Sequence, residues 1–270
     1  MKIPDNYHFI FLTANSEKEP REFSLINYLA IAACKAVNKP TKITVYCDNE
    51  PSGIWWNRAK PYLNCVRVKA PTAVFGNPIR RLCHVADVMR LDILKEEGGT
   101  YLDLDVICLR PFADLRDCEV VLGEERDVGL CNAVILASPG ARFLCRWLGA
   151  YRWFSDEDWN THSIKLPREL AKQFPDEIRV LDHRKFYWPM WYPKHLRAFC
   201  VGTGSRFSEQ AYCVHLWESV PWGYLKDMTP QKIWSGKSEF CELTKQYIDP
   251  AWIEGTTARI ENLRTHSIRD

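Results

Sequence analysis

The sequence has no long hydrophobic run, and this absence limits how the protein can meet a membrane. A membrane-spanning helix needs roughly 18 or more consecutive apolar residues, and no stretch of this chain approaches that length. The best candidate, YLAIAAC at residues 28–34, is stopped by Lys35. The opening MKIPDNYHFIFLTA places Pro4 and Asp5 where a secretory leader requires apolar side chains. We therefore expect a cytoplasmic protein with at most peripheral membrane contact.

The sequence also lacks an excess of charge of either sign. Its 36 lysines and arginines stand against 34 aspartates and glutamates, which leaves a net charge of +2. Proteins that bind nucleic acid usually carry a clustered basic face, whereas the basic residues of this chain are scattered. The pair Arg80-Arg81 is typical of a solvated helix face. We therefore expect no nucleic-acid partner.

The cysteines lack the spacing of a disulfide or zinc framework. The count of 11 is odd, and no two cysteines stand in a CxxC arrangement. Several of them, such as Cys34, Cys108, Cys131 and Cys213, lie within apolar runs, where a thiol behaves as a small hydrophobic group. We interpret them as mainly reduced core cysteines, which fits an intracellular protein.

Alternating strand and helix patterns are present throughout the first part of the chain. The composition, 46% hydrophobic in 270 residues, supports a sizeable core. Strand-like runs alternate with helical runs, which is typical of a parallel sheet with helices on its faces. The strands are expected at residues 7–13, 41–49, 64–70 and 100–109, and the helices at about 22–37, 52–63 and 79–97.

After Pro111 the pattern becomes less regular. Two further strands, 120–124 and 130–138, and a helix over 141–154 are expected, with one or two helices after residue 238. Residues from about 153 to 235 are rich in Trp, Tyr, Pro and His. We predict a single α/β domain over residues 1–270, in which residues 1–150 form a ligand-binding core and residues 151–270 form an acceptor or lid region with C-terminal helices.

The stretch GGTYLDLDVICL, residues 98–109, contains two aspartates inside an apolar run. Because side chains at i and i+2 of a strand share one face, a strand here projects Asp103 and Asp105 together. Two adjacent carboxylates repel one another, and a divalent cation such as Mg²⁺ or Mn²⁺ removes that cost. Ligands of open α/β sheets bind at the carboxyl ends of the strands. The alternative of two solvated aspartates at a strand end stays open from these residues alone.

The longer stretch ADVMRLDILKEEGGTYLDLDV, residues 86–106, resembles the sugar-binding DXD region of glycosyltransferase family 32 and its relatives. The family pattern combines an Asp and an Arg three positions apart, a helix, Gly-Gly, and a Tyr-x-Asp-x-Asp strand. In this chain Asp87 lies 16 residues before Asp103 (103 − 87), as the pattern requires. The resemblance implies a GT-A-like, Rossmann-type fold, a nucleotide-sugar donor and a divalent metal, usually Mn²⁺.

The resemblance also implies roles for the residues of this motif. Asp87 and Arg90 would hydrogen-bond the hydroxyl groups of the donor sugar. Tyr101 would line the nucleotide pocket. Asp103 would reach the ribose and a metal-bound water, and Asp105 would ligate the metal directly. A helix-surface ion pair for Asp87 and Arg90, and core packing for Tyr101, are the alternatives.

Two further segments are similar to parts of the family pattern. HFIFLT, residues 8–13, is similar to the family's first strand, which implies that Phe11 stacks on the base of the nucleotide or packs in the core. GLCNAVILASPGARFL, residues 129–144, resembles the family's Asn-Ala strand and the helix start after it. Asn132 would point into the site near the reacting carbon or the acceptor, or else bond backbone at a strand end.

The segment YCVHLWESVPWG, residues 212–223, is similar to the family's C-terminal His-Leu-Trp segment. His215 would be the third protein ligand of the metal, since neutral imidazole serves Mn²⁺. Ser219 and Trp222 would lie over the diphosphate of the donor. Their spacing, Ser-x-x-Trp, differs from the commoner adjacent Ser-Trp of the family.

Together these features predict a metal-dependent retaining glycosyltransferase. It would move a hexose from a UDP- or GDP-sugar to a hydroxyl of a glycan, glycolipid or protein, with Asp105 and Asn132 nearest the chemistry. Trp188, Trp191 and Tyr192 would stack on acceptor sugar or pack in the core. A mobile lid would order when the donor binds.

Two other classes of function stay open on sequence grounds. A glycoside hydrolase also uses paired carboxylates, but these flank the scissile bond at ~5–9.5 Å and usually come from separate segments. A non-catalytic protein that binds nucleotide sugars or carbohydrate could use the same fold. Neighbouring aspartates on one segment favour metal binding over hydrolysis.

Overall fold

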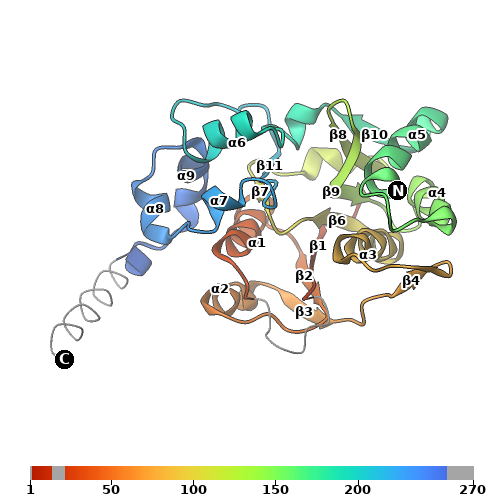
Figure 1. Ribbon diagram of the computed structural model, residues 1–270, viewed down its shortest axis with the longest axis horizontal. Coiled ribbons are helices and arrows are strands. Elements are labelled where there is room, and N and C mark those ends of the chain that lie inside the picture. Colours follow the sequence, from red (N-terminus) through yellow and green to blue (C-terminus); the bar gives the residue numbers. More distant parts are fainter. Residues whose placement is uncertain (1, 14–21, 254–270) are drawn as a thin grey trace. The chain divides into compact units, whose positions relative to one another are not determined.

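The computed structural model of the chain describes residues 2–13 and 22–253 (Figure 1). The chain divides into two compact units. The first comprises the residues up to Met190 together with Ser208–Leu216, and the second comprises Trp191–Phe207 and the residues from Trp217 onward. The predicted division of roles between residues 1–150 and 151–270 stays a prediction.

A seven-stranded sheet forms the centre of the first unit, with the strand order β10-β8-β9-β6-β1-β2-β3. The pairs β1–β2, β2–β3, β1–β6 and β8–β10 are parallel, and β9 is antiparallel to both β6 and β8. The predicted mostly parallel α/β sheet of the GT-A-like class is therefore confirmed. The strands span Asn6–Phe11 (β1), Lys42–Cys47 (β2), Asn64–Arg67 (β3), Gly99–Leu102 (β6), Val120–Glu125 (β8), Gly129–Ala137 (β9) and Arg179–Leu181 (β10).

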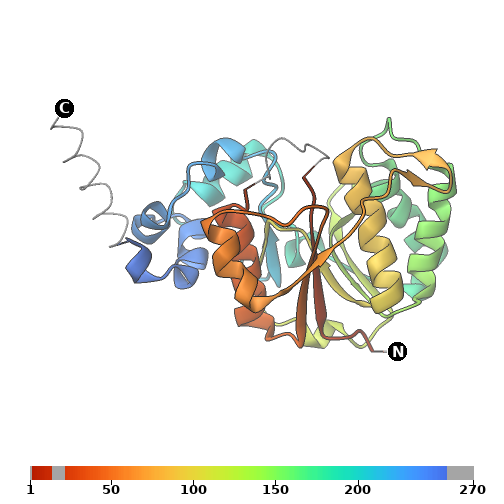
Figure 2. The ribbon, with the colours of Figure 1, turned by 90° about the horizontal axis from the view of Figure 1, so that it is seen from below.

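Helices cover both faces of this sheet. Figure 2 shows α1 and α2 on one face and α3 and α4 on the other. On the second face, α3 buries Val85, Val88 and Leu91 in the same hydrophobic cluster as Phe143 and Trp147 of α4. The helices span Leu25–Asn38 (α1), Ile54–Ala59 (α2), Leu82–Glu97 (α3), Arg142–Ala150 (α4) and Leu166–Gln173 (α5). The helical pattern read from residues 79–97 is thus confirmed as a helix that packs on the sheet.

The Gly98-Gly99 pair ends α3 and starts β6 in a way that other residues would not tolerate. Gly98 and Gly99 have φ angles of 62° and 106°, which side chains other than glycine rarely adopt. A Cβ on Gly99 would lie 2.5 Å from the carbonyl oxygen of Asn6 on β1. The glycines therefore allow β6 to enter the sheet directly beside β1.

Smaller elements complete the first unit. A hairpin is made by β4 and β5, and β11 pairs antiparallel with β7. These strands span Ala73–Val74 (β4), Asn77–Pro78 (β5), Val106–Cys108 (β7) and Cys213–His215 (β11). Short helical turns span Lys60–Tyr62 (η1), Ala113–Leu115 (η2), Tyr151–Trp153 (η3), Thr161–Lys165 (η4), Pro175–Glu177 (η5) and His183–Lys185 (η6).

The second unit is helical. Its helices pack around aromatic side chains, and the ring of Phe199 on α6 lies 6.3 Å from the rings of both Phe207 and Phe240. The elements span Pro193–Cys200 (α6), Trp222–Leu225 (α7), Pro230–Ser235 (α8), Glu239–Thr244 (α9) and Lys245–Tyr247 (η7). The prediction of helices after residue 238 is confirmed as far as the description extends.

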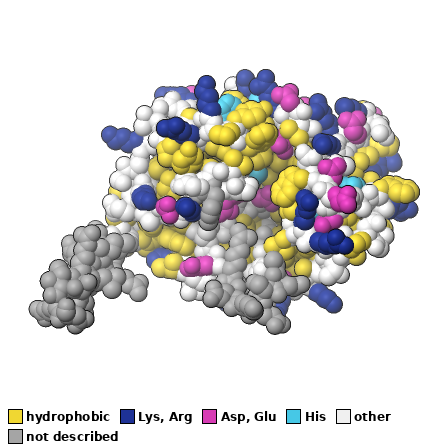
Figure 3. Space-filling model, viewed as in Figure 1, with side chains coloured by type: hydrophobic (Ala, Val, Ile, Leu, Met, Phe, Trp, Pro, Cys, Tyr) yellow, Lys and Arg dark blue, Asp and Glu magenta, His cyan; other side chains and the backbone are white. Residues whose placement is uncertain are grey.

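The lengths of the helices and the charges on the surface concern the expectations about membrane contact and nucleic-acid binding. No helix among the described residues is long and apolar enough to cross a bilayer. On the face shown in Figure 3, Lys and Arg side chains are scattered, and Asp and Glu side chains lie among them. The expected cytoplasmic location stays a prediction.

Candidate functional site

The two aspartates of the motif lie in a turn between strands. β6 ends at Leu102 and β7 begins at Val106, and the amide of Val106 donates to the carbonyl of Asp103 at 3.1 Å. The prediction of one continuous strand across Asp103 and Asp105 is therefore wrong. The tight turn, rather than strand alternation, brings the carboxylates together. We call residues 103–105 the DLD turn.

Neighbouring segments hold both ends of the DLD turn. The amide of Asp103 donates to the carbonyl of Ala133 on β9 at 2.9 Å. The amide of Leu216, directly after β11, donates to the carbonyl of Asp105 at 2.9 Å. The backbone of both aspartates is thus fixed by segments far away in the sequence.

A residue that the sequence analysis did not single out holds the middle of the turn. The side-chain amide of Asn27 donates to the carbonyl of Leu104 at 3.2 Å, and Asn27 is only 2% exposed. Asn27 also forms a capping box with Ser24 at the start of α1. Its side chain therefore couples the start of α1 to the DLD turn. The sequence around Ser24 indicates where the helix starts, but it does not indicate the contact between Asn27 and Leu104.

His215 joins the two aspartates, as predicted. The pairing of β11 with β7 sets His215 opposite Val106, next to the turn. One ligand atom from each of Asp103, Asp105 and His215 lies within 4.8 Å of the others. Two carboxylate oxygens and an imidazole nitrogen suit Mn²⁺ or another divalent ion. We call these three residues the Asp-Asp-His cluster, and their donor set fits the metal that the DXD pattern implies.

The electrostatics of the cluster depend on burial and on close opposite charge. Asp105 and His215 are 9% and 7% exposed, and Oδ1 of Asp105 lies 3.2 Å from Nε2 of His215. Burial lowers the pKa of His215, but the Asp105 carboxylate outweighs it and holds that pKa well above its usual value. A hydrogen bond with the thiol of Cys131 acts in the same direction as Asp105.

Arg90 links the DLD turn to α3. Its guanidinium lies 3.2 Å from Oδ1 of Asp103 and 3.4 Å from Oδ1 of Asp87. It also donates to the carbonyl of Asn132 at 2.8 Å and stacks at 4.5 Å over the ring of Tyr101. Burial opposes the charge of Arg90, but Asp103 and the other groups around it raise its pKa above the usual value. We call these five residues the polar network.

Two further hydrogen bonds complete the polar network. The hydroxyl of Tyr101 donates to Oδ1 of Asp103 at 2.6 Å, and the side-chain amide of Asn132 donates to Oδ1 of Asp87 at 2.7 Å. Burial raises the pKa of Asp87, although Arg90 and Asn132 lower it in part. The structure therefore brings Asn132 into the predicted site, with its side chain directed at Asp87.

Three of the predicted residues, Phe11, Ser219 and Trp222, are not members of the polar network. Phe11 at the end of β1 is 2% exposed, and its ring packs 5.5 Å from that of Phe23. Ser219 and Trp222 belong to the second unit. The predicted contacts of these three residues with base and diphosphate stay predictions.

Asp48, at the end of β2, is a further polar group that the sequence analysis missed. Its carboxylate accepts bonds of 3.0 and 3.1 Å from the amide and 3.1 Å from the hydroxyl of Thr13. The side chain of Asn49 donates to the same hydroxyl at 3.1 Å. Because β1, β2 and β6 are parallel, these groups and the DLD turn follow strands that end at the same edge of the sheet.

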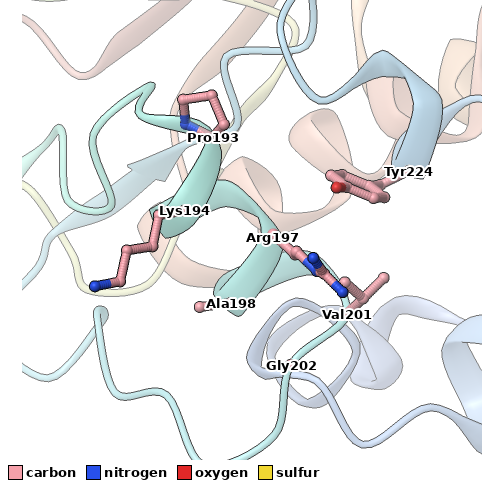
Figure 4. A pocket seen from close by; sticks show the side chains of 7 residues that line it. All are labelled: Pro193, Lys194, Arg197, Ala198, Val201, Gly202 and Tyr224. Carbon is pink, nitrogen blue, oxygen red and sulfur yellow. The ribbon is translucent and has the colours of Figure 1, made fainter.

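The second unit contains a cavity of its own, with a volume of about 770 Å³ (Figure 4). Two cationic side chains and a tyrosine from α6 and α7 contribute to its lining, which favours an anionic or hydroxyl-rich ligand. In the aromatic segment directly before the cavity, the rings of Trp191 and Tyr192 lie 4.8 Å apart. The lining residues are Pro193, Lys194, Arg197, Ala198, Val201, Gly202 and Tyr224.

Comparison with known proteins identifies relatives for most of the chain. Residues 3–125 match the model of the family described as "Glycosyltransferase sugar-binding region containing DXD motif". The chain is 32% identical over 263 residues to Glucan organizing enzyme 1 of Cryptococcus neoformans var. grubii, an alignment that covers 93% of this chain and 72% of that protein. This identity and coverage establish the family.

Solved structures of glycosyltransferases are more distant. The apo form of GlyE from Streptococcus pneumoniae TIGR4 aligns with a TM-score of 0.49 and 14% identity, over 98% of this chain and 64% of that one. Mouse xyloside xylosyltransferase 1 aligns with a TM-score of 0.45 and 11% identity, over 80% of this chain and 98% of that one.

Proposed function

Because this chain is a glycosyltransferase of the family with a DXD-containing sugar-binding region, we propose that it transfers a hexose from a nucleotide-diphosphate sugar. The donor would be a UDP- or GDP-sugar, and the acceptor a hydroxyl group of a glycan, glycolipid or protein. The observation that supports this proposal best is the convergence of Asp103, Asp105 and His215 next to the Arg90–Asp87 pair.

Metal dependence is part of the proposal. Asp103, Asp105 and His215 would hold one Mn²⁺ or Mg²⁺ ion. When bound, such an ion acts as a Lewis acid toward the diphosphate and neutralises charge on the leaving nucleoside diphosphate. Nε2 of His215 and Oδ1 of Asp105 lie 3.2 Å apart in a buried pair. A bound metal ion would replace the proton that His215 shares with Asp105, because an imidazole ligand must be neutral.

The polar network would recognise the donor sugar. Arg90 carries a permanent positive charge and is held by the carboxylates of Asp103 and Asp87. Asn132 orients the Asp87 carboxylate through one oxygen, which leaves acceptor capacity on that side chain for a sugar hydroxyl. Tyr101 fixes the Asp103 carboxylate in the same way. The sugar would thus meet groups whose positions are set before it binds.

We further propose that transfer occurs with retention of configuration. The acceptor hydroxyl would attack the anomeric carbon from the face on which the phosphate departs, while the bond from that carbon to the phosphate oxygen breaks. The acceptor proton would pass to that phosphate oxygen, so no side chain needs to serve as nucleophile. Asp105 and Asn132 are the residues expected nearest the reacting atoms.

The name of the relative that aligns with most of the chain bears on the class of acceptor. This name refers to the organisation of glucan. This supports a glycan over a protein as the acceptor of this chain.

A thermal-stability screen tests the proposal. Nucleotide sugars are added with Mn²⁺ or with EDTA to the wild type and to Asp105→Ala, and ligand binding raises the melting temperature by mass action. We expect one nucleotide family to stabilise the wild type only with metal, and Asp105→Ala to lose the effect. The matched control is Asp176→Ala, an exposed carboxylate on η5. Equal stabilisation of wild type and Asp105→Ala, or none with any nucleotide sugar, contradicts the proposal.

A further inference from the structure

Three large aromatic side chains of the first unit are exposed to solvent. Phe75, Trp153 and Trp159 are 54%, 79% and 63% exposed. Phe75 lies in the turn of the β4–β5 hairpin, and the two tryptophans lie at the end of η3 and in the loop after it. Exposed side chains of this size that gather in one region often mark an interaction site. We call these three residues the aromatic surface.

The two segments that carry the aromatic surface are bonded to one another. The side-chain amide of Asn77, next to the hairpin turn, donates to the carbonyl of Arg152 at 3.0 Å. The guanidinium of Arg152 lies 5.4 Å from the centre of the Phe75 ring. Because Trp153 directly follows Arg152, the hairpin contact places Phe75 and Trp153 in the same neighbourhood.

The loop that carries Trp159 is tied to α3 through His84. Nδ1 of His84 lies 2.7 Å from Oδ1 of Asp156, and its Nε2 lies 3.4 Å from the carbonyl of Trp159. The His84 and Trp159 rings are 6.3 Å apart, and the Phe154 ring meets His84 edge-on at 5.3 Å. His84 itself is 3% exposed. The loop therefore has a buried anchor while its tryptophan remains outside.

The anchor lies next to the proposed donor-sugar site. His84 and Asp87 are three positions apart on α3 and so share a helix face about one turn from each other. Because β6 begins directly after α3 ends, the N-terminal end of α3 lies at the edge of the sheet where β6 leads into the DLD turn. The loop that carries Trp159 is thus anchored on the same face of α3 as Asp87, about one helical turn away.

The charges around the aromatic surface are balanced. The loop between the two tryptophans contains Asp156, Glu157 and Asp158, while Arg80, Arg81 and Arg152 lie beside it or on the segments bonded to it. Such a surface does not favour an anionic lipid layer or a nucleic acid, both of which need excess positive charge. Flat indole faces next to many hydrogen-bonding groups match a partner that has apolar ring faces and hydroxyl groups but no net charge.

We propose that the aromatic surface binds a neutral glycan chain, the part of the acceptor beyond the hydroxyl that receives the sugar. Sugar rings would stack on Trp153 and Trp159, and their hydroxyls would bond to the polar side chains of the intervening loop. Phe75 would extend the same surface onto the hairpin. This inference rests on the proposed function, because it assigns the acceptor class of that same reaction.

Calorimetric titration with linear neutral oligosaccharides tests the inference. The probes are hexasaccharides of glucose, mannose, galactose and N-acetylglucosamine, added to the full chain. We expect at least one to bind the wild type and to bind the Trp153→Ala/Trp159→Ala double variant tenfold or more weakly, on the order of what loss of aromatic anchors costs. The matched control is Trp234→Ala, a tryptophan of the second unit that is 40% exposed. It should bind like the wild type.

Three results would overturn the inference. The first is equal binding by the double variant and the wild type, and the second is no binding of any probe. The third is that the wild type pellets with phosphatidylcholine–phosphatidylserine vesicles and the double variant does not. Stabilisation by nucleotide sugar with Mn²⁺ is measured on the same samples. If it persists while the glycan test fails, only the acceptor surface is rejected. If it is absent from the wild type, the proposed function itself fails.

Discussion

The polar network and the aromatic surface are built in opposite ways, although both depend on α3. Arg90 and Asp87 are 5% and 7% exposed and bonded on several sides, whereas Trp153 is 79% exposed. Groups that must meet a reacting centre in one geometry are held best by buried partners. Groups that hold a long and variable ligand can remain outside, where stacking tolerates small shifts. Substitutions in the polar network should therefore affect stability and reaction of the donor, whereas substitutions in the aromatic surface should affect binding of the acceptor.

The largest effect is expected for Asp105→Ala. The substitution removes one carboxylate of the Asp-Asp-His cluster and leaves His215 without the group that holds its charge. Transfer measured with radiolabelled donor should fall on the order of 10²-fold or more, as when one key electrostatic group of an active site is lost. If the aromatic surface binds only the acceptor glycan, Trp153→Ala should leave the rate at which water hydrolyses the donor unchanged. A similar loss of donor hydrolysis in Asp105→Ala and Trp153→Ala would contradict the assignment of donor and acceptor binding to different regions.

A large loss of stability is expected for Arg90→Met. The substitution leaves the carboxylates of Asp87 and Asp103 without their shared cation, and removing one partner of a buried pair costs about 3 kcal/mol or more. Urea denaturation monitored by circular dichroism measures this. The control is Arg126→Met, whose exposed arginine pairs with Asp127 and whose loss should cost under about 0.5 kcal/mol. Similar midpoints for the two variants would contradict the account of the polar network.

Asn27→Ala and Ser24→Ala form a matched pair that separates turn positioning from helix capping. Both substitutions break the capping box of α1, which costs about 1 kcal/mol of folding free energy. Only Asn27→Ala also removes the bond to the carbonyl of Leu104. It should weaken Mn²⁺ binding roughly tenfold, as loss of a supporting contact around a metal typically does, while Ser24→Ala should not. Equal Mn²⁺ affinity in the two variants would show that Asn27 acts on the helix alone.

A smaller effect on stability is expected from protonation of His8. This buried side chain lies at the start of β6, whereas the DLD turn follows its end. His8 is 0% exposed, lies 2.8 Å through Nε2 from the carbonyl of Gly98, and contacts the hydroxyl of Tyr46 at 3.2 Å. Burial lowers its pKa below the usual 6.5. The unfolded chain therefore binds a proton that the folded chain resists, so stability is lost as pH falls below about 6.5 toward the folded-state pKa. In urea titrations at several pH values, His8→Gln should flatten this slope. An unchanged slope would contradict it.

The sequence predicted the architecture well because its signals are local. The strand and helix order of the first 110 residues follows from periodicity, and the Gly98-Gly99 stop lies where α3 ends. The family resemblance named Asp103, Asp105 and His215 as one set, and one ligand atom from each lies within 4.8 Å of the others, whereas their role as metal ligands stays a prediction. The physical reason first given for it, alternation along a strand, was wrong, since a turn separates β6 from β7.

The contacts that the sequence did not reveal join distant segments. Asn27 and Leu104 are 77 positions apart, and nothing in the pattern around Ser24 points to the DLD turn. Asn132 bonds Asp87 across 45 positions, which no periodicity encodes. Such bonds depend on the strand order β9-β6-β1, which determines which loops meet at one edge of the sheet.

The most direct test of the central claim is a Mn²⁺ titration of the full chain, followed by the electron paramagnetic resonance signal of the free ion. The account predicts one site per chain that tightens when the correct nucleotide sugar is present. Asp105→Asn and His215→Gln should each weaken that site, and Asp176→Asn should not. Binding that is unchanged in both cluster variants, or insensitive to every nucleotide sugar, would contradict the claim that these side chains and the donor share one metal ion.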